Sequence, residues 1–229
     1  MKVKKIHDWS VDYREAVRIQ DRLKGKLILR GRAPAKLETV AGADISYSKG
    51  DDLFYAAVVL LRLPDFEILE EVFASGRVSF PYIPGLLTFR EGPILLRAFE
   101  RLRRVPDIVF FDGQGVAHPR GFGLAAHMGL LLDVPSVGCA KKRLVGTHGN
   151  VGEERGDHAD LLLDGKIVGA ALRTKKKVKP VYVSPGHRIG LEGARDAVLR
   201  CSAGYRIPEP TRRAHLTVNR RRRESVSSG

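Results

Sequence analysis

The chain has 229 residues, a length typical of one domain, and its 43% of hydrophobic residues excludes a disordered or fibrous chain. It carries 40 Lys and Arg residues against 26 Asp and Glu residues, which gives a formal net charge of +14. Such a charge attracts polyanions and favours a nucleic-acid partner, although a basic ribosome-like protein or a membrane-surface protein has a similar balance.

The two cysteines, Cys139 and Cys201, lack the spacing of a metal-binding pair, and Cys139 lies in an apolar run typical of a core. The first ten residues lack the apolar core of a signal peptide. No stretch is long and apolar enough to span a bilayer. We therefore expect a cytoplasmic protein without membrane contact, and we expect it to be a monomer.

The first half of the chain predicts one helix and then a three-stranded meander. Apolar residues spaced between charges indicate a helix over Ser10 to Leu27, with Ser10 as its cap. Three extended runs follow at Glu38 to Tyr47, Leu53 to Leu63 and Phe66 to Val78. Because the links between these runs are short, the three strands are expected to pair as antiparallel neighbours.

The second half predicts helices that alternate with buried strands. The expected elements are, in chain order, a helix over Thr88 to Arg103, a strand over Asp107 to Phe111, a helix over Phe122 to Leu132, strands over Ser136 to Ala140, Ala159 to Leu163, Lys166 to Arg173 and Val181 to Val183, and helices over Leu191 to Ser202 and Pro210 to Arg222. This pattern predicts an α/β fold with a mixed sheet, an antiparallel meander followed by parallel strands, flanked by helices. We expect one domain over residues 1–229, with a basic C-terminal helix and a short mobile tail at about 220–229.

Three acidic residues are candidates for a metal site. Asp44 interrupts the apolar strand VAGADIS, where a carboxylate is costly to bury unless it is paired or bound to a metal. Asp112 ends the strand DIVFF and is followed by GQG, at the kind of strand end where sites gather. Glu91 lies near the start of a helix, where the helix dipole alone would explain an acid. Taken alone, Asp44 is better explained by an exposed position on an alternating strand, and a turn would explain Asp112.

The three acids become informative in combination. Magnesium takes oxygen ligands, and paired metals can activate a water and stabilise the leaving oxygen of a phosphodiester. If the fourth strand pairs beside the first, Asp44 and Asp112 can converge with Glu91. Lys141 ends the next buried strand and would orient a water or neutralise a phosphate, as its neighbour Lys142 could, although both lysines would also suit an ordinary basic surface.

The segment FPYIPGLLTF, residues 80–89, is stiffened by Pro81 and Pro84. If it is exposed, its aromatic residue Tyr82 could wedge into a base stack. If it is buried, it is an apolar connection.

The motifs PYIPGLLTFREGP, DGQGVAHPRGFGLAAHMG, GCAKKRLVG and SPGHRIGLEGA, with GADISY before them, closely resemble those of the endonuclease V family, in the same order and over nearly the whole chain. The resemblance implies a ribonuclease-H-like fold and an enzyme that recognises deaminated adenine, as inosine, in nucleic acid. It implies hydrolysis of the second phosphodiester bond on the 3′ side of the lesion, with 3′-hydroxyl and 5′-phosphate ends. It also implies a need for Mg²⁺, which Mn²⁺ can replace.

The resemblance further implies roles for individual residues. The acidic metal set is Asp44, Glu91 and Asp112, with Lys141 as the catalytic lysine and His215 as a histidine that supports metal or water. The strand-separating wedge is Tyr82 with Pro81, Ile83 and Pro84. The lesion pocket is expected at Gly85, Leu86, Gly113, Leu124 and Ala140, and phosphate contacts are expected from His118, Arg120 and Lys142.

A lesion pocket has a physical rationale. Taking a base out of the stack costs a few kcal/mol. Hypoxanthine presents an N1–H donor and an O6 acceptor where adenine presents an acceptor and a donor. Backbone N–H and C=O groups can separate the two bases, because adenine would leave those groups unpaired.

Other functions remain open alongside a DNA repair enzyme that acts on deoxyinosine. An inosine-specific endoribonuclease would share the motifs, and a non-catalytic nucleic-acid-binding module on the same fold would explain the charge. A ribonuclease that cuts RNA–DNA hybrids would share the fold, but the PYIP segment argues against it. The arginines at 212–213 and 220–223 are predicted to track phosphate or to form a solvated helix end.

Overall fold

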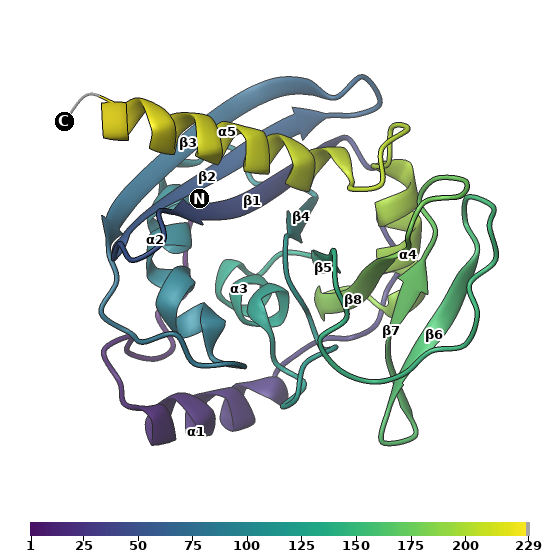
Figure 1. The fold of residues 1–229 in the computed structure, drawn as a ribbon, viewed down its shortest axis with the longest axis horizontal. Helices are drawn as coiled ribbons and strands as arrows, with labels where there is room; N and C mark the ends of the chain where they lie inside the picture. Colours follow the sequence, from purple (N-terminus) through teal and green to yellow (C-terminus); the bar gives the residue numbers. More distant parts are fainter. Residues whose placement is uncertain (228–229) are drawn as a thin grey trace.

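The structure, a computed structural model, describes residues 1–227 and folds them into an eight-stranded mixed sheet with helices on both faces (Figure 1). The strands are β1 (Thr39–Tyr47), β2 (Leu53–Arg62), β3 (Glu67–Arg77), β4 (Ile108–Phe111), β5 (Ser136–Ala140), β6 (His158–Leu163), β7 (Lys166–Leu172) and β8 (Val181–His187). The helices are α1 (Tyr13–Lys24), α2 (Leu87–Arg101), α3 (Leu124–Leu132), α4 (Leu191–Arg200) and α5 (Glu209–Ser227). The predicted α/β class is confirmed.

The sheet has two parts, with the order β3-β2-β1-β4-β5-β8-β7-β6. Strands β1, β2 and β3 form the predicted antiparallel meander, and β4 and β5 run parallel to β1. Beyond β5 the direction reverses, because β8, β7 and β6 pair antiparallel. Strands β4 and β5 are buried throughout, as strands covered by helices on both faces are.

The first helix shows how local chemistry sets an element's bounds. It begins at Tyr13, later than predicted, because Asp12 rather than Ser10 caps it: the Asp12 carboxylate accepts the backbone N–H of Glu15 at 2.8 Å. Across the described part of the chain, none of the helices has the length and apolar composition needed to cross a membrane.

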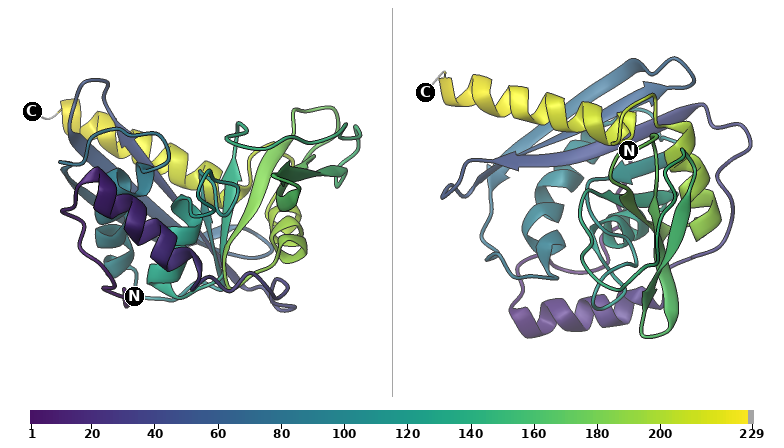
Figure 2. Two further views of the ribbon diagram at one scale, coloured as in Figure 1. Left: turned by 90° about the horizontal axis from the view of Figure 1, so that it is seen from below. Right: turned by 45° about the vertical axis from the view of Figure 1, so that its right-hand side comes forward.

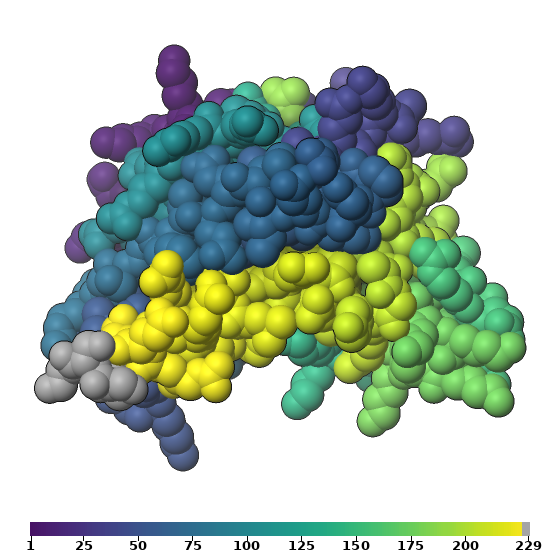
Figure 3. Space-filling view, turned by 90° about the horizontal axis from the view of Figure 1, so that it is seen from above, coloured from purple at the N-terminus to yellow at the C-terminus, as the bar shows by residue number. Residues whose placement is uncertain are grey.

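Helices α2 and α3 cover one face of the sheet, with α1 outside them, and α4 and α5 cover the other (Figure 2). Helix α5 lies as a ridge along the meander (Figure 3). It approaches closely because Gly42 has no side chain: a Cβ there would lie 1.9 Å from the Pro210 carbonyl oxygen. The helix continues to Ser227, beyond its predicted end at Arg222, and residues 228–229 of the tail for which we expect mobility lie outside the described residues.

The register between β1 and β4 brings two of the predicted acids together. Ala43 pairs with Phe111 in the parallel ladder, so the residues that follow them, Asp44 and Asp112, are neighbours. Strand β5 lies on the other side of β4 and leads directly into Lys141. Because the carboxyl ends of parallel strands meet at one edge of a sheet, the fold gathers these three side chains there.

Candidate active site

Asp44, Asp112 and His215 come from three separate elements, β1, the end of β4 and α5. One ligand atom of each lies within 4.8 Å of the other two. His215 Nδ1 lies 2.7 Å from Asp44 Oδ2, and the Asp44 side chain is 12% exposed. Two carboxylates and an imidazole at this spacing form a candidate site for a divalent metal ion.

Glu91 adds a third carboxylate from α2, outside that tight group. Burial, and then the charges of Asp44 and Asp112, raise the pKa of Glu91 to about 8. Burial and Asp112 also raise the pKa of Asp44, against the lowering effect of His215. Burial is the main cause of the raised pKa in both residues, the neighbouring carboxylates add to it, and Arg90 for Glu91 and His215 for Asp44 only partly offset it. A bound cation would favour the charged carboxylates.

Lys141 provides one positive charge at the cluster. Its Nζ atom lies 2.5 Å from Asp112 Oδ2. The lysine side chain is 41% exposed and the carboxylate 20%, so the pair lies at the surface of the site rather than in the core. An ammonium group there has further donors for a water or a phosphate oxygen.

A cavity of about 540 Å³ opens beside these residues, and its wall includes Asp112 and Lys141. Most of the residues predicted around a lesion pocket also line it: Gly85, Gly113, Leu124 and Ala140. Leu86 does not line the cavity, because its side chain is wholly buried in the apolar cluster between α1, α2 and α3. Among the five residues predicted at a lesion pocket, Leu86 is the one that lies behind the cavity wall.

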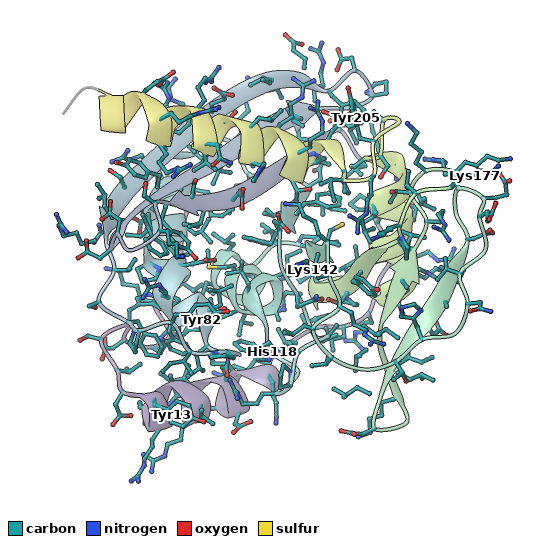
Figure 4. The ribbon with its side chains drawn as sticks, viewed as in Figure 1. Tyr13, Tyr82, His118, Lys142, Lys177 and Tyr205 are labelled. Carbon is teal, nitrogen blue, oxygen red and sulfur yellow. The ribbon has the colours of Figure 1, made fainter. Side chains whose placement is uncertain are left out.

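The segment 80–86, which we call the Tyr82 loop, borders the cavity. Tyr82 is 67% exposed and stands between the exposed residues Pro81 and Pro84, whereas Ile83 packs partly against the apolar cluster beneath. Of the two predicted alternatives for this segment, an exposed loop or a buried connection, the exposed loop is therefore the one observed at Tyr82. In Figure 4, Tyr82 lies close to α1, and Lys142 lies farther from that helix.

Two of the predicted phosphate contacts are bound within the protein. His118 is 4% exposed, and burial and Arg120 lower its pKa to about 4. Arg120 donates through Nη2 to the Gly85 carbonyl at 2.6 Å and through Nε to Gln20 Oε1 at 2.5 Å, and Gln20 donates to the same carbonyl at 3.0 Å. These contacts hold the Tyr82 loop to α1. Lys142, in contrast, is exposed at the cavity.

Sequence reasoning missed two further residues of the site. Arg90 precedes Glu91 on α2 and donates to the carbonyl of Phe80 at 2.7 Å. Gln114 lines the cavity and donates to the Lys142 carbonyl at 3.2 Å, while its buried Oε1 has no partner among the described residues. Both residues lie inside quoted motifs, FREGP and DGQG, so the signal was present in the sequence.

The arginines of α5 form ion pairs both within the helix and with the sheet. Arg212 and Arg213 both reach the buried carboxylate of Glu209 at 2.8 Å, and Arg220 reaches Glu71 of β3 at 3.4 Å. Arg220 therefore links α5 to β3, whereas the ion pairs of Arg212 and Arg213 lie within the first turns of α5 itself.

Comparisons with known proteins find relatives over almost the whole chain. The family model described as Endonuclease V matches residues 21–216. Endonuclease V of Myxococcus xanthus is 52% identical over 215 residues, which are 94% of this chain and 92% of that protein. The crystal structure of endonuclease V from Streptomyces avermitilis is 41% identical, with a TM-score of 0.92 over 99% of this chain and 100% of that chain.

A third relative was solved with a nucleic acid. Endonuclease V of Ciona intestinalis, 26% identical with a TM-score of 0.82, covers 92% of this chain and 98% of its own, and its structure is a complex with a 24mer DNA containing an inosine followed by a ribo-adenosine. The superpositions on endonuclease V structures confirm the predicted ribonuclease-H-like fold.

Proposed function

The chain belongs to the endonuclease V family and is an endonuclease, and on that premise we propose that it cuts DNA at inosine as the first step of repair. The proposed cut is at the second phosphodiester bond 3′ to the lesion and leaves 3′-hydroxyl and 5′-phosphate ends. One observation carries the proposal: the cavity reaches the acidic cluster, because Asp112 belongs to both and Lys141, on the cavity wall, contacts Asp112.

The cavity suits a base that has left the stack. Leu124 offers an apolar surface, and Gly85 and Gly113 leave room in the wall because they have no side chains. Donors and acceptors of the backbone could match the N1–H and O6 of hypoxanthine and would be left unpaired by adenine. We assign to Tyr82, which is exposed at the border of the cavity, the role of filling the gap that the extruded base leaves.

The acidic cluster suits Mg²⁺, or Mn²⁺ in its place. Its donors are carboxylate oxygens, which these ions prefer, and burial together with the mutual repulsion of the carboxylates raises the pKa values of Glu91 and Asp44. Asp44, Asp112 and Glu91 would hold the ion, which when bound would activate a water and stabilise the leaving oxygen of the phosphodiester. His215 contacts Asp44 through Nδ1 and so orients that carboxylate.

In this proposal, the basic residues at the cavity bind the nucleic-acid strand. Lys141, at 2.5 Å from Asp112, can hold the attacking water or a non-bridging oxygen of the reacting phosphate. Lys142 and Arg143 are exposed on the wall of the cavity and attract the phosphate backbone towards the site.

The test is incision of a labelled oligonucleotide that carries one deoxyinosine, against the same strand with deoxyadenosine. We expect a single cut one nucleotide beyond the lesion that EDTA abolishes and Mg²⁺ or Mn²⁺ restores. Asp112→Asn should abolish cutting, whereas Asp164→Asn, an exposed acid in the β6–β7 turn, should not. Folded protein that leaves the deoxyinosine strand intact would rule out the proposal.

A matched RNA strand with one inosine, incubated at the same Mg²⁺ and salt concentrations, tests the endoribonuclease alternative. Faster cutting of the RNA would assign that function instead. Binding without cutting, unaffected by EDTA, would assign a non-catalytic module.

A further inference from the structure

Lys141 is the first residue after β5, so its backbone lies outside the sheet. The pairing of β5 with β8 ends at Ala140, opposite Tyr182, so the ladder provides no partner for the next carbonyl. A carbonyl in this position needs a donor from elsewhere. Arg206, in the connection between α4 and α5, supplies it, because its Nη2 atom lies 2.7 Å from the Lys141 carbonyl oxygen.

The same guanidinium also holds the loop that leads into β8. Arg206 Nη2 lies 2.9 Å from the Pro180 carbonyl oxygen, and Nε lies 2.9 Å from that of Lys179. The backbone carbonyl of Arg206 accepts the hydroxyl of Thr174, a buried residue, at 2.6 Å. One side chain therefore joins the end of β5, the start of β8 and the α4–α5 connection.

The connection is itself fixed to α5. The ring of Tyr205 lies under the guanidinium of Arg212 at 4.3 Å, and Arg212 is bound to the buried Glu209 in the first turn of the helix. Figure 4 shows Tyr205 near the beginning of α5. Helix α5 carries His215, so the connection is anchored both to the helix of the metal-site histidine and, through Arg206, to the end of β5.

We propose that Arg206 is a positioning residue that fixes the backbone of Lys141 and thereby keeps its Nζ atom beside Asp112; this rests on the proposed function, in which Lys141 acts at the reacting phosphate. The lysine side chain is flexible and 41% exposed, so surrounding side chains restrain it little, and the anchored backbone sets its reach. Gln114 holds the next carbonyl, that of Lys142, at 3.2 Å. Arg206 itself does not line the cavity, so it acts through Lys141.

Two variants and a matched control test the proposal. Arg206→Met removes the donors and keeps much of the side chain's length. Arg206→Lys keeps the charge but loses the planar fork that reaches several carbonyls at once. The control is Arg173→Met, because Arg173 also binds three backbone carbonyls, those of Gly152 at 2.8 Å, Val151 at 2.9 Å and Val178, none of them part of the site.

The first readout is single-turnover incision of the deoxyinosine strand at saturating Mg²⁺, with strand binding measured separately in EDTA. We expect Arg206→Met to lower the rate constant about 10²-fold, the scale of a misplacement of about 1 Å, with little change in the dissociation constant. Arg206→Lys should recover only part of the rate, and Arg173→Met should keep it. An equal loss in Arg206→Met and Arg173→Met would overturn the proposal.

The second readout is a double-mutant cycle. Because Arg206 acts through Lys141, the variant with both Lys141→Met and Arg206→Met should cut no more slowly than Lys141→Met alone. Losses that multiply would show that Arg206 acts independently of Lys141 and would overturn the proposal.

The third readout needs no incision and so separates this proposal from the proposed function. Acylation of Lys141 by an amine-reactive reagent, followed by mass spectrometry, should be faster in Arg206→Met than in wild type, because a loosened ammonium leaves Asp112, and Arg173→Met should match wild type. An unchanged labelling rate overturns the positioning role even if wild type cuts at inosine. A faster rate in a protein that does not cut supports the positioning role and rejects the proposed function alone.

Discussion

The Nζ atom of Lys141 lies 2.5 Å from Oδ2 of Asp112, so the lysine neutralises one of the clustered acids. Glu91 has no such partner, since no hydrogen bond or ion pair links it to any side chain within residues 1–227. Burial and the neighbouring carboxylates raise the pKa of Glu91 to about 8. The metal-free protein therefore carries an electrostatic cost at this residue, which a cation or a neutral substitute would remove.

Glu91→Gln should stabilise the metal-free protein at alkaline pH. The folded-state pKa of about 8 lies above the ordinary value of 4.5, so the folded state binds the extra proton between these values. This contribution to stability is fully present below about pH 4.5 and is lost as the pH rises through 8. Melting curves in EDTA should show that the Tm of wild type falls more towards pH 9 than the Tm of Glu91→Gln. The difference should be a few degrees, because 1 kcal/mol shifts the Tm of a protein of this size by about 2–4 °C.

The matched control for Glu91 is Glu100→Gln, an exposed acid on the same helix, whose melting curve should follow wild type. Added Mg²⁺ should raise the Tm of wild type more than that of Glu91→Gln, because a ligand stabilises the state that binds it. Superimposable curves for wild type, Glu91→Gln and Glu100→Gln would show that Glu91 does not interact with the acidic cluster.

His127→Phe should reduce the loss of thermal stability that acid pH causes. His127 is buried in α3, 2.7 Å from His7 between their Nε2 atoms and stacked on Trp9, and burial lowers its pKa well below 6.5. With a lowered folded-state pKa, the stability is present above pH 6.5 and is lost as the pH falls below it. The wild-type Tm should decline more steeply from about pH 7 to pH 5 than that of the variant, whereas the exposed His158→Phe should leave the slope unchanged.

Tyr82→Ala should reduce incision without loss of stability, because the ring is 67% exposed. Base–aromatic contacts are worth about 1–3 kcal/mol, which corresponds to a loss of about 5- to 150-fold in kcat/KM. The loss should be larger on duplex than on single-stranded substrate, since only the duplex must be opened. Tyr13→Ala, at an exposed tyrosine in α1, is the control, and equal effects of the two variants would contradict a wedge role for Tyr82.

Arg120→Met should lower both Tm and kcat/KM while leaving the salt dependence of binding unchanged. Arg120 donates to the Gly85 carbonyl and to Gln20, and a hydrogen bond from a charged group contributes about 1.5–3 kcal/mol. A phosphate contact would instead contribute about one unit to the slope of log K against log salt. Lys142→Met, at an exposed lysine on the cavity wall, is the comparison in which that slope should fall.

The strands and the candidate acids were predictable because both depend on short-range patterns. Buried strands such as 136–140 stand out as apolar runs, and a short link between two runs implies antiparallel neighbours. Helix ends were less predictable, because Asp12 and Ser10 can each cap a helix and only the folded backbone shows which one does. The reversal after β5 also needed the structure, since no local pattern distinguishes a parallel from an antiparallel partner for a buried strand.

Roles of polar residues were less predictable than their presence. Arg120 was expected at phosphate, but Gln20, 100 residues earlier, and Gly85 bind it within the protein. Gln20 gave only a weak signal, as a polar residue on the apolar face of a helix. Arg206 gave no signal, because its partners are backbone carbonyls in the loops that follow β5 and precede β8.

By itself, the sequence determined the α/β order of elements, the family and the set of acids, because periodicity and motifs are properties of neighbouring residues. Only the tertiary structure decided which side chains meet: Asp44 with His215 across 171 residues, and Lys141 with Asp112 at the edge of the sheet. Such contacts depend on strand register and on the packing of α5 against β1, which no local pattern encodes. The same packing decided that Arg206 holds the backbone of Lys141.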